Sequence, residues 1–355
     1  MNKFKLGAKR PLIISGPCSA ETREQTLDTC VKLAETGVVD VLRAGVWKPR
    51  TSPGTFEGVG LKGLAWMAEA KRLTGLPVGV EVATAKHVES ALEFEIDLVW
   101  IGARTTVSPF AVQDVADALK GSGVPVMIKN PMNPDIDLWA GAVKRFAAVG
   151  IPMDDIGLIH RGFSYFGQQR YRNAPMWPLA FEMRSRFPET MMICDPSHMA
   201  GTTEYLHELS QSAADLRYDG LIVESHVCPA EALSDAGQQL VPAELERLVR
   251  GVNWRREAAD DPGFVKALDR FRDQIDQIDA ELFSLLGRRM SISEEIGRVK
   301  KANDVAILQS SRWGAIKERI LSQADTLGLG REFLNDILEA IHLESINRQN
   351  SVMNF

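Results

Sequence analysis

The chain has 355 residues, of which 45% are hydrophobic and 25% are charged, a composition typical of a globular protein long enough for more than one domain. This composition excludes disordered chains, collagen-like chains and disulfide scaffolds. The formal net charge is −6, so there is no basic excess to neutralise a nucleic-acid backbone, and we expect no nucleic-acid partner.

The beginning of the chain and its cysteines predict a cytoplasmic protein without membrane contact. Residues 1–10 carry several charges where a signal peptide needs an apolar core, and no later stretch approaches the ~18 apolar residues of a membrane span. The cysteines, Cys18, Cys30, Cys194 and Cys228, form no Cys-x-x-Cys pair and are too sparse for a secreted disulfide framework. Each is therefore either a buried thiol or a ligand.

Eight short apolar runs, rich in Val and Ile, recur through the first part of the chain. They are continuous rather than alternating, as expected for strands buried on both faces, and the segments between them have helical spacing, as at Leu61, Leu64 and Met67. Eight strand-then-helix units over ~250 residues predict an α/β fold of the (β/α)8 TIM-barrel type, with a doubly wound open sheet as the alternative. The runs are Pro11–Ser15, Val38–Leu42, Val78–Val82, Leu98–Gly102, Pro125–Ile128, Ile156–Ile159, Met191–Ile193 and Gly220–Val223.

After Val249 the pattern changes, because residues 250–263 are polar and end in an Asp-Pro-Gly stop signal. We therefore predict a barrel over residues 1–250, a linker over 251–263 and a helical domain over 264–355.

From Phe264 the apolar residues keep a spacing of four and three, which predicts one long helix to about Lys301. Such a helix would be ~57 Å long, longer than a domain of roughly ninety residues is wide, so we expect its far end to pack against a second chain. Two shorter helices, about Asp304–Gln323 and Arg331–Gln349, should follow, with a break at Leu327–Gly330. The tail is thus predicted to be an all-α, three-helix domain.

Cations gather where the predicted strands end. Arg43, Lys48 and Arg50 follow the second strand, and the list continues with Arg104, Lys129 and Arg161 after the fourth, fifth and sixth. In a barrel these strand ends form the rim that carries the active site. A single arginine after a strand is most often a surface cap, but six cations at one rim repel one another unless a polyanion joins them. We therefore predict a substrate, or substrates, with at least two anionic groups.

The remaining rim residues form a candidate metal site. Cys18 follows the first strand, His198 follows the seventh, Glu224 lies at the end of the eighth, and Asp235 lies in the next loop. One thiolate, one imidazole and two carboxylates suit Mn²⁺, Fe²⁺, Zn²⁺ or Co²⁺, while spacing alone leaves open a buried cysteine and a core histidine. His160 and His226, also at strand ends, are second-rank candidates for proton transfer or a supporting role.

Residues 58–63 (Gly-Val-Gly-Leu-Lys-Gly) fit the G-x-G-x-x-G pattern of dinucleotide-binding proteins. That pattern binds a pyrophosphate only where it directly follows a strand and opens a helix. Here it follows the loop at residues 48–57. We therefore predict that these glycines shape a loop over the rim.

Short motifs at the strand ends carry a family resemblance. They are Gly16-Pro17-Cys18-Ser19, Lys48-Pro49-Arg50-Thr51-Ser52, Gly102-Ala103-Arg104-Thr105-Thr106, Lys129-Asn130, His160-Arg161-Gly162, Asp195-Pro196-Ser197-His198, Glu224-Ser225-His226 and Ser234-Asp235-Ala236-Gly237-Gln238. In this order they resemble the type I beta family of 3-deoxy-D-arabino-heptulosonate 7-phosphate (DAHP) synthases over residues 1–250. The resemblance implies condensation of phosphoenolpyruvate with erythrose 4-phosphate, water addition and phosphate release, the first step toward chorismate. Octulosonate 8-phosphate synthase, which shares the barrel and uses arabinose 5-phosphate, is the alternative, although the motif at residues 48–51 resembles the heptulosonate branch.

The resemblance also implies roles for single residues. It implies that phosphoenolpyruvate is bound by Arg43, Lys48, Arg104, Lys129 and Arg161, with Lys48 and Arg43 as catalytic residues at the reacting centre. It implies that Arg50 and Thr51 bind the phosphate of erythrose 4-phosphate. It further implies that a divalent metal ion, which polarises the aldehyde oxygen while C3 of phosphoenolpyruvate attacks, is held by Cys18, His198, Glu224 and Asp235.

Polar groups continue the apolar faces of two tail helices. Arg289 lies on the stripe of the long helix, where a buried charge is costly unless it is paired or reaches solvent. In the third helix, Ser345 and Gln349 continue an apolar series at positions 334, 338 and 341. These positions predict a local anion site in the tail.

The tail resembles the all-helical chorismate mutase family over residues 264–350. The resemblance implies that chorismate is bound by Arg272, Arg289, Lys300, Arg312, Ser345 and Gln349, with Arg289 and Lys300 as catalytic residues. In that family each chain's long helix lends one arginine to the other chain's site, here Arg289 if the order is kept, so the resemblance implies a homodimer, with higher association left open. Trp313 and Gln309 depart from the family, because acidic residues that contact the substrate hydroxyl and support the site are expected there.

We therefore predict a bifunctional enzyme, a DAHP synthase barrel fused to a chorismate mutase that converts chorismate to prephenate. That rearrangement is intramolecular, so holding the compact conformer and stabilising charge on the breaking C–O bond suffice. Fusion of a first step to a late one invites feedback, and we expect prephenate or chorismate on the tail to alter the barrel's rate. The alternative is a non-catalytic tail that senses a pathway product and dimerises the chain.

Overall fold

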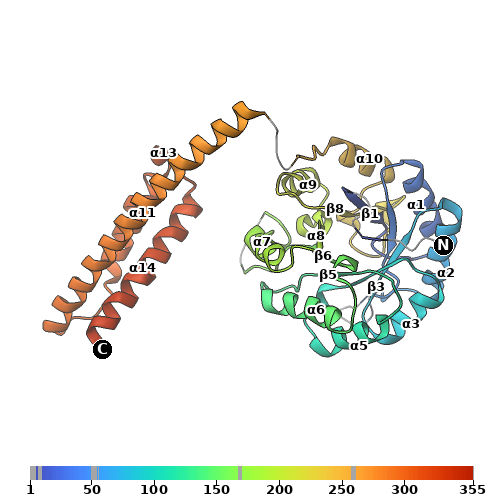
Figure 1. Ribbon diagram of the computed structural model, residues 1–355, viewed down its shortest axis with the longest axis horizontal. Coiled ribbons are helices and arrows are strands. Elements are labelled where there is room, and N and C mark those ends of the chain that lie inside the picture. Colours follow the sequence, from blue (N-terminus) through green and yellow to red (C-terminus); the bar gives the residue numbers. More distant parts are fainter. Residues whose placement is uncertain are drawn as a thin grey trace. The chain divides into compact units, whose positions relative to one another are not determined.

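The chain divides into two units, Met1–Glu257 and Ala258–Phe355. The structure, a computed structural model, describes residues 5–6, 10–48, 54, 56–166, 170–256 and 261–354, and the side chains of residues 310 and 311 are outside this description. Figure 1 shows strands ringed by helices in the first unit and helices alone in the second.

Eight parallel strands form a closed barrel in which neighbours pair in chain order. The predicted TIM barrel is confirmed, and the open-sheet alternative is wrong because β1 pairs with β8, from Leu12 opposite Gly220 to Gly16 opposite Glu224. Gly220 permits this closure, since a Cβ atom there would lie 2.0 Å from the carbonyl oxygen of Leu12. The strands are β1 Leu12–Gly16, β2 Val41–Ala44, β3 Val78–Val82, β4 Leu98–Ile101, β5 Val126–Lys129, β6 Ile156–His160, β7 Met191–Cys194 and β8 Gly220–Glu224.

The strands are buried on both faces, as their continuous apolar runs predict. One set of side chains, including Ile14, Trp100 and Ile193, fills the inside of the barrel. A second set, including Val80 and Leu158, packs between the strands and the surrounding helices. The polar rim therefore stands on a rigid apolar support.

Helices follow the strands and cover the outside of the barrel (Figure 1). Side-chain oxygens of Thr22, Thr84, Ser108 and Asp135 each cap a helix by accepting a backbone N–H of its first turn. The helices are α1 Arg23–Glu35, α2 Leu61–Thr74, α3 Ala85–Glu93, α4 Ala103–Thr106, α5 Pro109–Leu119, α6 Ile136–Ala148, α7 Trp177–Arg186, α8 Pro196–Ala200, α9 Leu206–Asp215 and α10 Pro242–Gly251, with 3-10 turns η1 Met153–Asp155, η2 Pro229–Glu231 and η3 Ala236–Gln238.

The second unit begins with one helix, α11 (Pro262–Ala302), of 41 residues, so the predicted long helix is confirmed. Asp261 caps it by accepting the N–H of Phe264 at 2.7 Å. It is followed by α12 (Ser310–Leu321), α13 (Ala324–Leu327) and α14 (Arg331–Asn354). α12 begins later than predicted, because Asp304 adopts a φ of 56° and turns the chain first. Within the described ranges, no helix combines the length and apolar character needed to cross a membrane.

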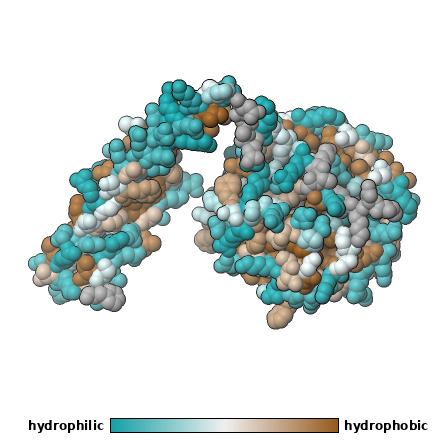
Figure 2. Space-filling view, in the orientation of Figure 1, coloured by the Kyte–Doolittle hydropathy of each residue, from teal (hydrophilic) through white to brown (hydrophobic). Residues whose placement is uncertain are grey.

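Helix α11 packs along α14 in the second unit. Gly297 permits the close approach, since a Cβ atom there would lie 2.5 Å from Cγ2 of Val352, and Glu294 pairs with Arg348 at 3.4 Å. Apolar side chains nonetheless remain on the surface of this unit (Figure 2). The exposed members of the α11 stripe are Phe264, Phe271, Ile275, Ile278, Leu282, Leu285, Ile292, Ile296 and Val299. A continuous apolar surface of this kind is typical of an interface.

Candidate functional site

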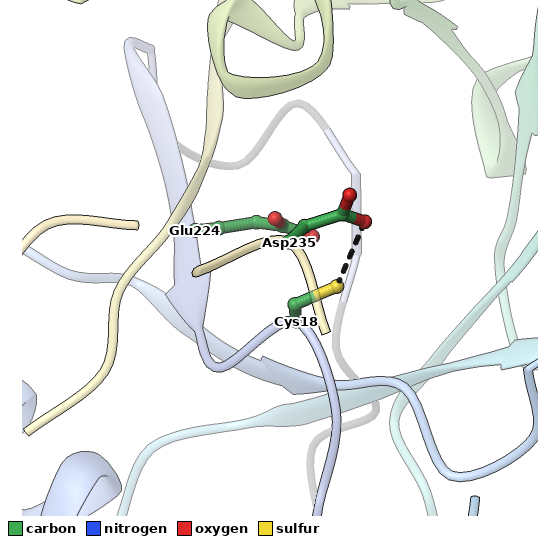
Figure 3. A group of neighbouring side chains, drawn as sticks. All are labelled: Cys18, Glu224 and Asp235. Carbon is green, nitrogen blue, oxygen red and sulfur yellow. Dashed lines mark hydrogen bonds between the residues drawn. The ribbon is translucent and has the colours of Figure 1, made fainter. Parts of the chain in front are cut away.

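Three side chains at the carboxyl ends of the barrel strands form a compact cluster of metal-type ligands, Cys18, Glu224 and Asp235 (Figure 3). Cys18 follows β1 and Glu224 ends β8, so the β1–β8 pairing that closes the barrel brings them together. Asp235 lies directly before η3 with a left-handed φ of 46°. One ligand atom of each residue lies within 4.8 Å of the other two.

His198 lies beside this cluster, on α8. Its Nε2 is 3.8 Å from Oε1 of Glu224, and its Nδ1 is 2.9 Å from Oδ2 of Asp195. Asp195 also caps α8 by accepting the backbone N–H of His198 at 3.1 Å. The Asp195 carboxylate therefore fixes the imidazole with Nε2 toward Glu224, an arrangement that commonly orients metal-binding histidines.

Neighbouring positive groups keep the two carboxyl groups of the cluster ionised. Burial alone would raise the pKa of Glu224, but His198 and Arg43 are the chief groups that together lower it to about 2. Burial also opposes the lowering of the Asp235 pKa, yet a hydrogen bond from Arg172 and nearby positive charge bring it to about 2. Both carboxylates are therefore negative and attract a cation at neutral pH.

The thiol of Cys18 lies against an ammonium group. Burial, followed by the charge of Glu224, raises the thiol pKa to about 11, and Nζ of Lys48 donates to the sulfur at 2.9 Å. Gly45 leaves room for that side chain, since a Cβ atom there would lie 3.0 Å from Nζ of Lys48. A metal ion that bound this sulfur would displace the thiol proton.

Three of the predicted rim cations are buried: Arg43, Lys129 and Arg161. Arg43 donates to Oε1 of Glu224 at 2.9 Å, and Lys129 donates to Oδ2 of Asp195 at 2.9 Å.

Unlike Arg43 and Lys129, Arg161 has no carboxylate partner among the described residues. Its Nη1 donates to neutral oxygens, Oδ1 of Asn173 at 2.8 Å and the carbonyl of Gly162 at 3.3 Å. Burial lowers its pKa to about 10, with Asp195 opposing that change in part. Among the described residues it forms no direct ion pair, so an anionic ligand is the group that would compensate its buried charge.

A cavity of about 150 Å³ lies at this rim. Five of its lining side chains are positively charged. Two residues that were predicted to bind the sugar phosphate, Arg50 and Thr51, are outside the described residues. Arg43 does not line the cavity and lies against the ring of Trp100, with its guanidinium carbon 5.2 Å from the ring centroid. The charged and polar lining residues are Lys48, Glu81, Arg104, Lys129, Arg161, Arg172, Asn173, His198 and Asp235.

Several residues of this site were given no role in the sequence-based prediction, and Asn173, the acceptor of Arg161, is one of them. Arg172 donates to Oδ1 of Asp235 at 2.9 Å from the loop between β6 and α7, where no strand end marks it. Glu81 lies within β3 and accepts from the indole N–H of Trp100 at 3.1 Å; a lone acid in an apolar strand could have indicated it. Asp195 directly follows β7, and the same strand-end rule that selected the cations could have found it.

The second-rank histidines are not in the lining of the cavity. His160 is fully buried, its Nδ1 lies 2.7 Å from the hydroxyl oxygen of Tyr218, and burial lowers its pKa to about 3. Nδ1 of His226 accepts the N–H of Cys228 at 2.9 Å. Both histidines therefore act in packing and local hydrogen bonding.

The first half of the G-x-G-x-x-G segment, residues 58–60, forms a loop, and residues 61–63 are the first residues of α2. Because a loop and not a strand precedes this helix start, the segment is not a strand-to-helix phosphate site. Gly58 has a φ of +94°, and a Cβ atom there would lie 2.3 Å from the carbonyl oxygen of Val46. Gly60 precedes α2 and donates its N–H to Val46 at 2.9 Å. The glycines close the base of the loop that follows β2.

The helical unit contains a second cavity of about 140 Å³, among α11, α12 and α14. Arg289 of α11 donates to the hydroxyl of Ser345 on α14, and Nζ of Lys300 donates to the carbonyl of Ile307. The side chain of Gln349 is buried, and its Oε1 has no hydrogen-bond partner. The polar and aromatic lining residues are Arg289, Ser293, Lys300, Gln309, Arg312, Trp313, His342, Ser345 and Gln349.

The expectation that Arg289 is lent to another chain is wrong, because it lines the cavity of its own chain and bonds Ser345 there. Arg272 is the predicted ligand residue that does not line this cavity. Its side chain is 65% exposed and lies 3.6 Å from Asp269. It is seventeen residues before Arg289 on the same helix, which corresponds to about 25 Å along the axis.

Both units match models of known families. Residues 2–258 match the DAHP synthetase I family, and residues 271–350 match chorismate mutase type II.

Individual relatives are similar to the chain over about two thirds of its length. A phospho-2-dehydro-3-deoxyheptonate aldolase of Thermotoga maritima is 33% identical over 241 residues, which is 68% of this chain and 68% of that protein. A 2-dehydro-3-deoxyphosphooctonate aldolase of Variovorax paradoxus is 32% identical over 268 residues, covering 67% of this chain and 88% of that protein. The crystal structure of the Thermotoga maritima phospho-2-dehydro-3-deoxyheptonate aldolase (DAHP synthase) has a TM-score of 0.62 at 31% identity and covers 69% of each chain.

Proposed function

The chain belongs to the DAHP synthetase I family, and we propose that its barrel condenses phosphoenolpyruvate with erythrose 4-phosphate to give DAHP and phosphate. The observation that supports this most directly is the cavity at the rim, lined by five cationic side chains beside the Cys18, Glu224 and Asp235 cluster. Two phosphorylated substrates, one with an additional carboxylate, would balance the excess of positive charge in such a cavity.

The ligand cluster fits a divalent transition metal. Cys18, Glu224 and Asp235 converge, and His198 presents Nε2 toward them, so one sulfur, one nitrogen and two carboxylates would hold Mn²⁺, Fe²⁺, Zn²⁺ or Co²⁺. When bound, such an ion supplies Lewis acidity toward the aldehyde oxygen. A site that depends on a reduced cysteine also suits the cytoplasm, where thiols are kept reduced.

The cations would have different roles in the proposed reaction. Arg161, buried against neutral acceptors, would bind an oxyanion of phosphoenolpyruvate together with Lys129 and the exposed Arg104. Lys48 lines the cavity and lies against Cys18, so its ammonium would stand where the C–C bond forms. Arg43, beneath it, would hold Glu224 and add positive charge as C3 of phosphoenolpyruvate attacks the aldehyde carbon. Water then adds at C2, and the C2–oxygen bond breaks to release phosphate.

The choice of aldose separates the two barrel functions. Phosphate release is measured with phosphoenolpyruvate and either erythrose 4-phosphate or arabinose 5-phosphate. The heptulosonate proposal expects a much larger kcat/KM with erythrose 4-phosphate. A preference for arabinose 5-phosphate would contradict it and favour the octulosonate reaction, which the name of the Variovorax paradoxus relative describes for that protein.

For the tail, we propose rearrangement of chorismate to prephenate. The supporting observation is the cavity that gathers Arg289, Lys300 and Arg312 near Ser345 and Gln349. Three cations can bind two carboxylates and an ether oxygen, and no nucleophile is required, because the rearrangement depends on holding a compact conformer and stabilising charge on the breaking C–O bond.

A sensing module is the second candidate for the tail, favoured by Trp313 and Gln309 in the cavity lining where acids were expected. Loss of chorismate absorbance with the full-length protein distinguishes a mutase from a sensing module. Rapid conversion supports the mutase. Binding of chorismate without conversion would make the tail a sensor.

We also propose that α11 forms a homodimer with a second copy. Its apolar stripe is exposed in the single chain, as Phe271, Ile278 and Leu285 illustrate, and Arg272 lies too far along the helix to serve its own cavity. In a dimer, Arg272 would enter the cavity of the partner subunit. Sedimentation should give twice the chain mass, and Ile278→Glu should give monomers.

Feedback between the units completes the proposal. Prephenate or chorismate bound in the tail would change the barrel's rate through the dimer. Heptulosonate synthesis is followed at rising prephenate concentration, with Arg289→Ala as the control that cannot bind it. An unchanged rate at saturating prephenate would contradict the feedback proposal and leave the two activities independent.

A further inference from the structure

Two aromatic rings form a stacked pair in the tail cavity. Trp313 of α12 and His342 of α14 have ring centroids 3.9 Å apart and planes inclined by 5°. Both line the cavity that contains Arg289 and Lys300. Because a face-to-face stack restricts rotation of the imidazole about its side-chain bonds, His342 is held in one orientation.

His342 has unused hydrogen-bonding capacity. Within the described part of the chain, neither of its ring nitrogens forms a hydrogen bond. Partial burial, followed by the charge of Arg289, lowers its pKa, so the ring is neutral at pH 7. A neutral imidazole both donates and accepts a hydrogen bond, as a hydroxyl partner requires.

The charged side chains that line the cavity are all positive. Arg289, Lys300 and Arg312 are its charged lining residues, and its lining contains no carboxylate. These cations would be occupied by the carboxylates and the ether oxygen of chorismate, so the neutral polar groups of the lining remain as partners for the ring hydroxyl. His342 is one such lining group and is held by a stack, whereas the side chain of Gln309 is exposed.

We propose that His342, held flat against Trp313, makes the hydrogen bond to the ring hydroxyl of the substrate. This proposal rests on chorismate being the ligand of the tail. It gives the stacked pair the function that acidic side chains at positions 309 and 313 were expected to supply. Trp313 is then a positioning residue, since it acts through His342.

The test compares chorismate with 4-deoxychorismate, the analogue that lacks the hydroxyl, on the full-length protein. His342→Phe keeps an aromatic ring for the stack and removes both nitrogens. We expect kcat/KM for chorismate to fall about 10-fold or more, as when one buried hydrogen-bonding group loses its partner. The value for 4-deoxychorismate should stay within about 2-fold of wild type, because no hydrogen bond is lost.

Two further variants distinguish a direct contact between His342 and the substrate from an effect of His342 on the fold of the tail. Gln309→Met is the matched control and should leave the ratio between the two substrates unchanged. Trp313→Phe should retain most of the discrimination, since a smaller ring still stacks. Helical circular dichroism reports that each variant is folded, and His342→Gln provides a second variant if His342→Phe fails to fold.

The outcomes are distinct. If His342→Phe lowers kcat/KM equally for both substrates, or for neither, the proposed role of His342 is wrong. The proposed mutase activity of the tail would still stand. Loss of discrimination in Gln309→Met alone would assign the hydroxyl to Gln309. If wild type binds chorismate without turnover, dissociation constants for the same two ligands provide the same comparison. If wild type does not bind chorismate, the proposed tail function and this inference both fail.

Discussion

Nη1 of Arg43 lies 2.9 Å from Oε1 of Glu224, and the two side chains are 2% and 1% exposed. The same guanidinium donates through Nη2 to the carbonyl oxygen of Cys18 at 3.1 Å. One arginine therefore ties together the ends of β1 and β8, where the barrel closes. It also connects the ligand cluster with the ring of cations, so its removal should affect both stability and catalysis.

We expect Arg43→Ala to lower the free energy of unfolding of the barrel by about 3–5 kcal/mol, because Glu224 would remain as a buried carboxylate without its partner. The measurement is urea unfolding followed by barrel tryptophan fluorescence. Arg104→Ala, which removes an exposed rim cation, is the control and should change stability by less than about 0.5 kcal/mol. Similar stabilities for the two variants would mean that the buried pair adds nothing to the fold.

The metal assignment predicts that a chelator and Cys18→Ala each abolish condensation. The physical reason is that the sulfur would supply one of the four proposed ligands, and its loss would open the site. Cys30→Ala is the matched control, since Cys30 is also a buried thiol but lies outside the cluster. Metal content by mass spectrometry should fall in the Cys18 variant alone. Full activity of metal-free protein would exclude the proposed ligands.

His160 makes the stability of the barrel depend on pH. Burial lowers its pKa from 6.5 to about 3. Between these two pH values, His160 is protonated in the unfolded chain and neutral in the folded chain. The stabilisation is complete above pH 6.5 and is lost as the pH falls toward 3, by at most about 1.4 kcal/mol per pH unit. Urea unfolding between pH 7 and pH 4 measures this slope.

Two variants isolate that contribution. His160→Gln removes the titrating group and should give a shallower slope, whatever its absolute stability. Tyr218→Phe removes the hydrogen bond to Nδ1 but keeps the buried imidazole, so it should cost about 1 kcal/mol at neutral pH and retain a steep slope. Parallel slopes for wild type and His160→Gln would show that other groups control the acid transition.

The barrel and most of its rim could be predicted from local patterns, because each strand is a short apolar run and most rim residues follow one. The run Val78–Val82 is a strand with the same bounds, and Lys48, Lys129 and Arg161 meet at one cavity. Arg172 could not be predicted in this way. Its contact with Asp235 depends on how a long loop returns over the barrel, and no residue spacing records that path.

The tail shows a different limit of sequence reasoning. Periodicity places Arg289 on the apolar stripe of the long helix and the family resemblance adds Arg272, but neither says which chain each residue serves. The hydrogen bond from Arg289 to Ser345 within one chain decides this point for Arg289. The length of α11 leaves Arg272 far from the same cavity, so in the proposed dimer Arg272 is the residue that would enter the partner's site.

The proposed exchange of Arg272 between subunits predicts complementation of two defective chains. Arg289→Ala should cost at least about 2 kcal/mol of transition-state stabilisation, as loss of a charged donor does, and Arg272→Ala should be comparably impaired if the partner's site uses it. In a mixed dimer, the chain that carries Arg272→Ala keeps its own Arg289 and receives Arg272 from its partner. One intact site is restored.

After denaturation and refolding together, an equal mixture should recover about a quarter of the wild-type chorismate turnover, since half of the dimers are mixed and each has one intact site. Mixing without refolding is the control and should recover less, in proportion to subunit exchange. If Arg272 acted within its own chain, both sites of every mixed dimer would carry one defect. Refolded mixtures would then be no more active than the average of the two separate variants.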